Sequence, residues 1–109
     1  RYVGDPSAAV ERVAVFGGAG NDFIGTARSA GADAYVTADV KYHAFFGALG
    51  RDGTPAMALI DAGHYETEAL TEALLRDWLS ERFAGVDWQR TQTRTSPIRT
   101  FVPGEVNGA

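Results

Sequence analysis

The chain has 109 residues, of which 45% are hydrophobic, and a formal net charge of −4, a balance typical of one globular domain. It contains no cysteine, which excludes disulfides and cysteine-ligated metal sites. The negative charge argues against nucleic acid or an anionic membrane as a partner. No apolar run approaches the roughly 18 residues of a membrane-spanning helix, and the first residues do not resemble a signal peptide, so we expect a cytoplasmic protein.

The first part of the chain predicts a linker, a strand and a turn. Residues 1–11 are polar or small and are interrupted by Gly4 and Pro6, so we expect a linker there. The run RVAVFG at 12–17 is short and apolar and ends in glycine, which predicts a buried strand. The GGAG segment at 17–20 indicates a flexible turn between this strand and the next element.

A helix is predicted next, which Asn21 or Asp22 can cap and which ends at Gly31. Strand and helix then alternate twice more, with a strand, a short helix, a strand and the longest helix predicted over residues 33–39, 40–50, 55–63 and 64–83. Residues 85–92 fit a fourth strand.

This alternation predicts one α/β domain over residues 12–98. We expect three layers, in which crossover helices cover a mostly parallel sheet of about four strands. Residues 99–109 show little pattern and are expected to form an irregular tail.

Residues that can bind an anion, hold a metal ion or transfer a proton fall at the carboxyl ends of the predicted strands, where open α/β sheets bind their ligands. In chain order they are Gly18, Gly20, Asp39, His43, Asp61, His64 and Glu68. We therefore expect the glycine loop, both histidines and two or three acids to lie at one edge of the sheet.

His64 and Glu68 lie four residues apart, so on a helix they share one face. An imidazole and a carboxylate placed this way can reach one zinc, manganese, iron or nickel ion. The same stretch also suits a plain helix start, because Glu66 and Glu68 favour the helix N-terminus and His64 can cap it or pair with an acid. Spacing alone leaves both interpretations open.

The glycine loop and His43 each have two interpretations as well. Glycines after a strand can bring backbone N–H groups to an anion, but this loop lacks the GK[ST] of a P-loop and has Phe23 where a dinucleotide fingerprint needs a third glycine. A tight turn without a ligand is the alternative. His43 is either a proton donor or acceptor over the same pocket or a half-buried helix residue.

Three stretches, VAVFGGAGNDFI, GADAYVTADVKYH and LIDAGHYETE, occur here in that order. Together they resemble the C-terminal half of the GTP cyclohydrolase I type 2 homologs, also called Nif-three-like or NGG-interacting-factor-like proteins. The resemblance covers residues 12–70, with a weaker match at TSPI, residues 95–98.

The resemblance implies a two-part α/β protein with a dinuclear metal centre between its halves, assembled as a ring-shaped homohexamer. The family's HYxTE motif supplies a histidine and a glutamate to the metals, and these correspond to His64 and Glu68. The other family ligands, two adjacent histidines and an aspartate, come from the N-terminal half, and this chain has no His-His pair. Because the chain starts at Arg1 and not at Met, we expect the C-terminal portion of a longer protein, with two divalent ions completed by ligands outside this chain.

The family's TG[DE]xKYH-like motif corresponds to residues 37–43, with two departures. Ala38 replaces the usual glycine, which shifts the strand exit at most. Ala44 stands where an acid is common, which weakens the case for a proton relay through His43.

Our first hypothesis is a metal-dependent hydrolase acting on a nucleotide or another phosphorylated compound. In it Gly18, Gly20, Asp39 and His43 line the pocket, and Asp61 orients a ligand histidine. A second hypothesis is a non-catalytic metal-binding scaffold or regulatory protein that acts through oligomer assembly. A third is a nucleotide-binding module that uses only the GGAG loop.

Overall fold

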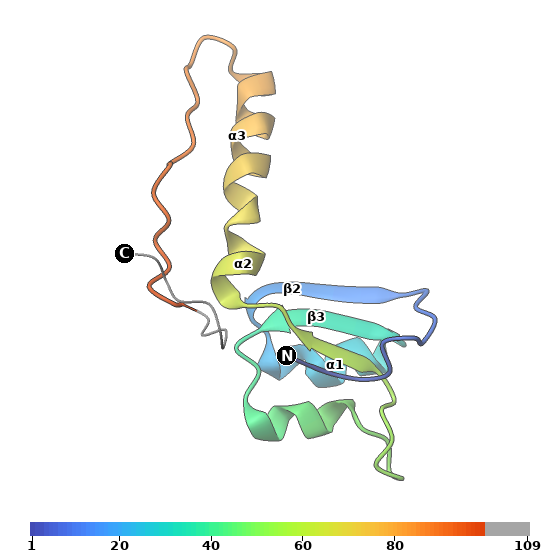
Figure 1. Ribbon diagram of the computed structural model, residues 1–109. Helices are drawn as coiled ribbons and strands as arrows, with labels where there is room; N and C mark the ends of the chain where they lie inside the picture. Colours follow the sequence, from blue (N-terminus) through green and yellow to red (C-terminus); the bar gives the residue numbers. More distant parts are fainter. Residues whose placement is uncertain (100–109) are drawn as a thin grey trace.

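The computed structural model describes residues 1–99, in which a four-stranded sheet carries helices on one face and a long helix at its carboxyl edge (Figure 1). The strands are β1 (Tyr2–Val3), β2 (Val13–Ala19), β3 (Ala34–Ala38) and β4 (Ala58–Asp61), in the spatial order β1-β4-β3-β2. β2, β3 and β4 are parallel, and β1 pairs antiparallel with β4. The predicted α/β class with a mostly parallel sheet of four strands is confirmed.

The fourth strand, however, is not the predicted one. Residues 85–92 have no regular structure, and the fourth position belongs to β1, within the segment expected to be a linker. β1 pairs in the register Tyr2↔Ile60 and Val3↔Leu59, which satisfies the outer edge of β4. Of the predicted tail, only Arg99 lies among the described residues.

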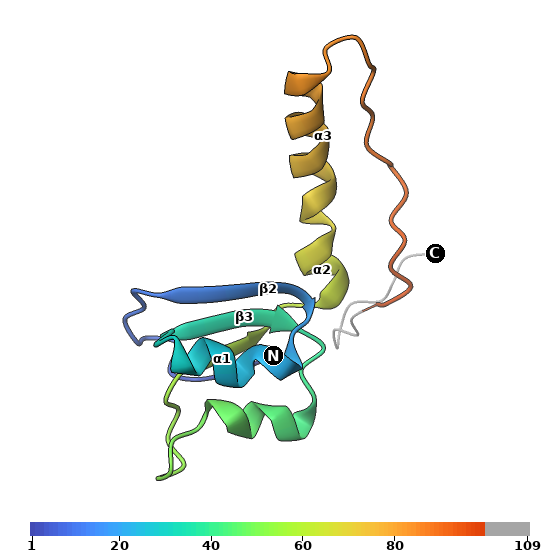
Figure 2. The same ribbon diagram turned by 180° about the vertical axis from the view of Figure 1, so that it is seen from behind.

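The remaining elements are helical. They are the 3-10 helices η1 (Asn21–Phe23) and η2 (Tyr42–Ala48) and the α-helices α1 (Ile24–Ser29), α2 (His64–Glu68) and α3 (Leu70–Arg82). The helix predicted over residues 64–83 is therefore divided at Ala69. Figure 2 shows α1 and η2 on the same face of the sheet. None of the helices described within residues 1–99 is long and apolar enough to cross a membrane.

The core lies between the sheet and the α1–η2 layer. Tyr35 of β3 and Leu59 of β4 are partners across the two strands and are 2% and 0% exposed. They pack with Ile24, Val40 and Met57, which are also buried. The sheet and its helices thus hold the carboxyl ends of β2, β3 and β4 in fixed positions.

Two apolar surfaces stay uncovered by residues 1–99. One is the sheet face opposite the helices, where the side chain of Val15 on the edge strand β2 is 73% exposed. The other surface is α3, which rises away from the sheet and has no buried residue (Figure 1). Its exposed side chains include Leu70, Leu74 and Trp78. The predicted apolar face of this helix is therefore largely uncovered by the described residues.

Candidate metal site

His64 and Glu68 lie at the two ends of the short helix α2, directly beyond the carboxyl end of β4. The His64 Nε2 atom is 3.2 Å from Glu68 Oε1. On the other side of the ring, His64 Nδ1 is 2.6 Å from Oδ2 of Asp39, the residue that follows β3. The imidazole therefore bridges two carboxylates, and all three side chains are about half exposed.

These carboxylates determine the protonation of His64. The hydrogen bond to Asp39 raises the pKa of His64, partial desolvation opposes that rise, and the negative charge of Glu68 adds to it, so the net pKa lies above the usual value. When the imidazole is neutral with its proton on Nδ1, Nε2 and Glu68 Oε1 are both acceptors. Their approach to 3.2 Å is favourable only when a positive charge, either a proton or a metal ion, lies between them.

Gly18 lies directly against this pair. Its φ of +71° is in the left-handed region, and the register between β2 and β3 is irregular around it. A Cβ atom at Gly18 would overlap Glu68 Oε1 and lie 3.0 Å from His64 Nε2. The Gly18 N–H donates to Thr67 Oγ1 at 3.0 Å, so this amide is already engaged by α2.

Gly20, by contrast, packs into the core. The hydroxyl groups of Thr37 and Tyr35 donate to the carbonyls of Gly18 and Gly20, each at 3.0 Å. A Cβ at Gly20 would overlap both hydroxyl groups, and Thr37 and Tyr35 are buried. The GGAG segment is therefore a packed junction between β2 and β3, and most of it belongs to β2 instead of forming a free turn.

The carboxylate on the Nδ1 side of His64 is that of Asp39, whereas Asp61 was predicted to orient a ligand histidine. Asp61 instead accepts hydrogen bonds from the Arg1 guanidinium and from the N–H groups of Val40 and Gly63. Burial raises the pKa of Asp61, but these hydrogen bonds and the charge of Arg1 outweigh it, so the pKa lies below the usual value. Asp61 thus ties β1, β4 and the turn after β3 together.

His43 is exposed on η2, where its ring meets Tyr42 edge-on at a centroid distance of 5.1 Å. Among residues 1–99, no hydrogen bond or ion pair connects it to the His64 cluster. Its role in proton transfer stays a prediction.

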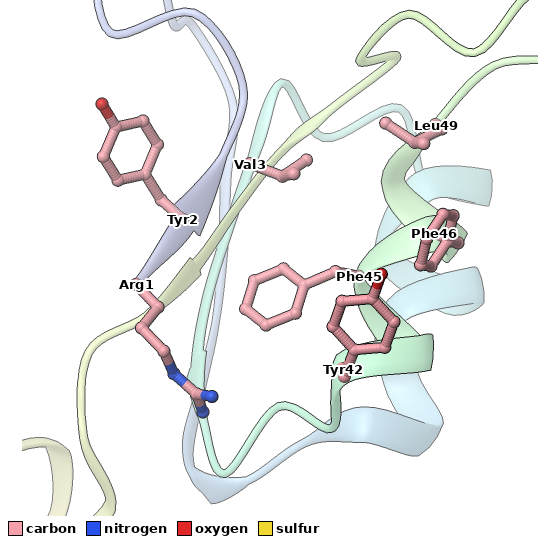
Figure 3. A pocket seen from close by; sticks show the side chains of 7 residues that line it. All are labelled: Arg1, Tyr2, Val3, Tyr42, Phe45, Phe46 and Leu49. Atoms are coloured by element: carbon pink, nitrogen blue, oxygen red, sulfur yellow. The ribbon is translucent and has the colours of Figure 1, made fainter.

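A separate apolar pocket of about 270 Å³ opens between β1 and η2 (Figure 3). Val3 and Phe45 line it, and the Arg1 guanidinium lies 5.8 Å from the centre of the Phe45 ring. None of the residues that line this pocket belongs to the His64 cluster.

The donor atoms of the cluster fit part of a metal site. Two nitrogen or oxygen ligands of one transition-metal ion lie about 3.0–3.4 Å apart, because each is about 2.0–2.1 Å from the ion. The 3.2 Å between His64 Nε2 and Glu68 Oε1 is within that range. A carboxylate on the other nitrogen of a ligand histidine, as Asp39 provides, is a recurring arrangement. Within the described part of the chain, no group of three or more potential ligands is placed to hold an ion.

Several proteins of known sequence or structure are similar to this chain. A GTP cyclohydrolase 1 type 2 homolog from Bacillus subtilis is 35% identical over 105 residues, which cover 94% of this chain and 27% of that protein. One of the same name from Nostoc is 45% identical over 92 residues, or 84% of this chain and 33% of the relative. The crystal structure of a Staphylococcus aureus protein is similar with a TM-score of 0.72 at 29% identity, and covers 93% of this chain and 33% of that one.

A Bacillus cereus protein related to NIF3 is similar with a TM-score of 0.65 at 30% identity, covering 93% of this chain and 28% of that chain. The chain therefore spans about a quarter to a third of the length of the relatives it matches. Residues 1–97, which are nearly the whole of the 109-residue chain, match the model of one family. The chain belongs to the Duf34/NIF3 (NGG1p interacting factor 3) family.

Proposed function

We propose that this chain supplies His64 and Glu68 as two ligands of a dinuclear metal centre in a metal-dependent hydrolase. The observation that carries the proposal is the pair of acceptor atoms 3.2 Å apart, which lie against a glycine because any Cβ atom there would overlap them. The relatives extend well beyond the region matched here, which leaves room in such a protein for the remaining ligands.

When bound, the two ions would polarise a phosphorylated substrate and lower the pKa of a water molecule between them. Each residue of the cluster has a distinct part in holding that site. Asp39 orients the His64 ring, Glu68 adds negative charge, and Gly18 keeps the approach to both clear. Because some relatives are named GTP cyclohydrolase 1 type 2 homolog, purine nucleoside triphosphates are the first substrates to test.

A second candidate is a metal-binding scaffold that acts through assembly and not through catalysis. The uncovered apolar side chains of α3 favour it, since exposed apolar patches mark interaction surfaces. In both cases we propose a homo-oligomeric protein, a hexamer by analogy with the family, without nucleic acid or a membrane as partner.

Elemental analysis of the longer protein that contains this chain tests the ligand assignment. We expect Glu68→Gln to reduce the bound metal and Glu66→Gln to leave it unchanged. Glu66 is the matched control, because it is in the same helix and its carboxylate is 3.7 Å from Arg94 instead of contacting His64. Equal metal content in the parent protein and Glu68→Gln would refute the assignment.

Turnover separates the two candidates. Hydrolysis of a nucleoside triphosphate that is lost in His64→Ala supports the hydrolase, whereas intact metal without turnover on any phosphorylated substrate supports the scaffold. For the 109-residue chain alone we expect weak binding or none, because no group of three or more potential ligands is placed to hold an ion within residues 1–99. Tight binding of two ions by this chain would contradict the proposal that further ligands lie elsewhere.

A further inference from the structure

The turn that presents Asp39 to His64 has an unusual backbone. Asp39 has a φ of +52° and is the only residue other than glycine with a positive φ among those described. A side chain with a Cβ atom enters this region at an energetic cost, so surrounding contacts must hold it there. The Asp39 side chain is itself 58% exposed, so packing does not fix the direction of its carboxylate.

The side-chain amide of Asn21 holds this turn from both sides. Asn21 Nδ2 donates to the Asp39 carbonyl at 2.8 Å, and the Lys41 N–H donates to Asn21 Oδ1 at 3.1 Å. Asp61 engages the Val40 N–H between them at 3.2 Å. Three successive residues of the turn are thus each bound by a side chain from a distant segment.

Asn21 is well suited to this role and is not used elsewhere. It begins η1 but forms no cap, because the N-cap positions of η1 and α1 are Gly20 and Phe23, without side-chain cap hydrogen bonds. The bridge needs a donor and an acceptor on two separate atoms of a short side chain, which the Nδ2 and Oδ1 atoms of asparagine provide. Aspartate has the same shape but would place a second acceptor against the Asp39 carbonyl.

We propose that Asn21 is a positioning residue for the candidate metal site. Its amide fixes the turn over residues 39–41, so that Asp39 accepts the Nδ1 proton of His64 and the Nε2 lone pair is directed toward Glu68 and the space beside Gly18. An imidazole without a fixed partner exchanges its proton between its two nitrogens, whereas a charge-assisted hydrogen bond favours one tautomer about tenfold or more. The effect of Asn21 on metal affinity rests on the proposed function, but its effect on the tautomer does not.

NMR of the metal-free 109-residue chain tests the tautomer directly. Long-range proton–nitrogen spectra at a pH where imidazole is neutral report which ring nitrogen carries the proton. We expect His64 to be protonated mainly on Nδ1 in the parent chain, because Asp39 at 2.6 Å is a nearer acceptor than Glu68 at 3.2 Å, and to shift toward protonation on Nε2 in Asn21→Ala and Asn21→Asp. Two controls should not change: His43 in every variant, and His64 in Asp22→Asn, which alters the neighbouring residue of the same helix.

The possible outcomes separate the alternatives. An unchanged His64 tautomer in Asn21→Asp would overturn the proposal, as would a general loss of the folded spectrum in both Asn21 variants, which would show a purely structural role. Titration of the longer protein with Zn²⁺ should give affinity about 10- to 100-fold lower in Asn21→Asp, as expected for a residue behind a ligand. If the parent binds no Zn²⁺ while the tautomer shifts as expected, the proposed function fails and the positioning role stands. If the parent binds Zn²⁺ and the tautomer does not respond to the Asn21 substitutions, the positioning role fails and the proposed function stands.

Discussion

Replacing Gly18 by alanine separates the requirements of the site from those of the fold. Two costs follow from the structure. An alanine at a φ of +71° costs about 1–2 kcal/mol of folding free energy. The added Cβ also overlaps the Glu68 carboxylate, which is the far end of an exposed side chain and can move aside. That movement ends the contact with His64, and such an exposed pair contributes little to stability.

Gly53→Ala is the matched control, because Gly53 has a φ of +81° and open space where the Cβ would lie. We expect urea denaturation to show similar losses for the two variants, differing by no more than about 1 kcal/mol. Metal content of the proposed longer protein should fall in Gly18→Ala and stay unchanged in Gly53→Ala. Normal metal content in Gly18→Ala, or a stability loss several kcal/mol larger than in the control, would refute this account of Gly18.

Three further predictions concern the framework around the site. Gly20→Ala should lower the free energy of unfolding by about 2–4 kcal/mol, since its Cβ meets two buried hydroxyl groups. Gly25→Ala, at a helix position with open space, should instead raise the free energy of unfolding by about 0.5–1 kcal/mol. Asp61→Ala should cost about 1–3 kcal/mol in urea denaturation, because the hydrogen bonds from Arg1 and two backbone N–H groups lose their acceptor. The lowered pKa of Asp61 means that its contribution is present above its unfolded pKa of about 4 and is lost as the pH falls through the folded value, so stability measured between pH 6 and 2 should decline less steeply in Asp61→Asn. An identical acid decline in parent and variant would contradict that assignment.

The sequence predicted those parts of the fold that depend on local pattern. Apolar runs located β2, β3 and β4, because strands buried in a parallel sheet are continuously apolar. β1 was missed because two residues show no periodicity, and its pairing depends on the open edge of β4. Residues 85–92 have the sequence pattern of a strand but form none. Trp88 contacts Phe83 instead: their rings lie 6.3 Å apart, and the Trp88 Nε1–H donates to the Phe83 carbonyl.

In the candidate site, too, the features that depend on local sequence pattern were predicted and the others were not. The spacing of His64 and Glu68 on one helix predicted their contact, and the position of Gly18 at a strand end placed it beside them. The choice between Asp39 and Asp61 as partner of His64 could not be made from the sequence, because both lie at the carboxyl end of a strand at the same edge. It depends on the left-handed backbone at Asp39, which turns its carboxylate toward the ring while Asp61 turns toward Arg1.

The exposed helix α3 has a consequence for hydrogen exchange. It has 13 residues, none of them buried, and an isolated helix of that length is marginal in water. Its backbone amides should therefore exchange much faster in the 109-residue chain than those of β3, whose side chains are mostly buried. Any surface that covers Leu70, Leu74 and Trp78 would slow that exchange, so that docking on α3 and the ordering of the helix would be measured as one event.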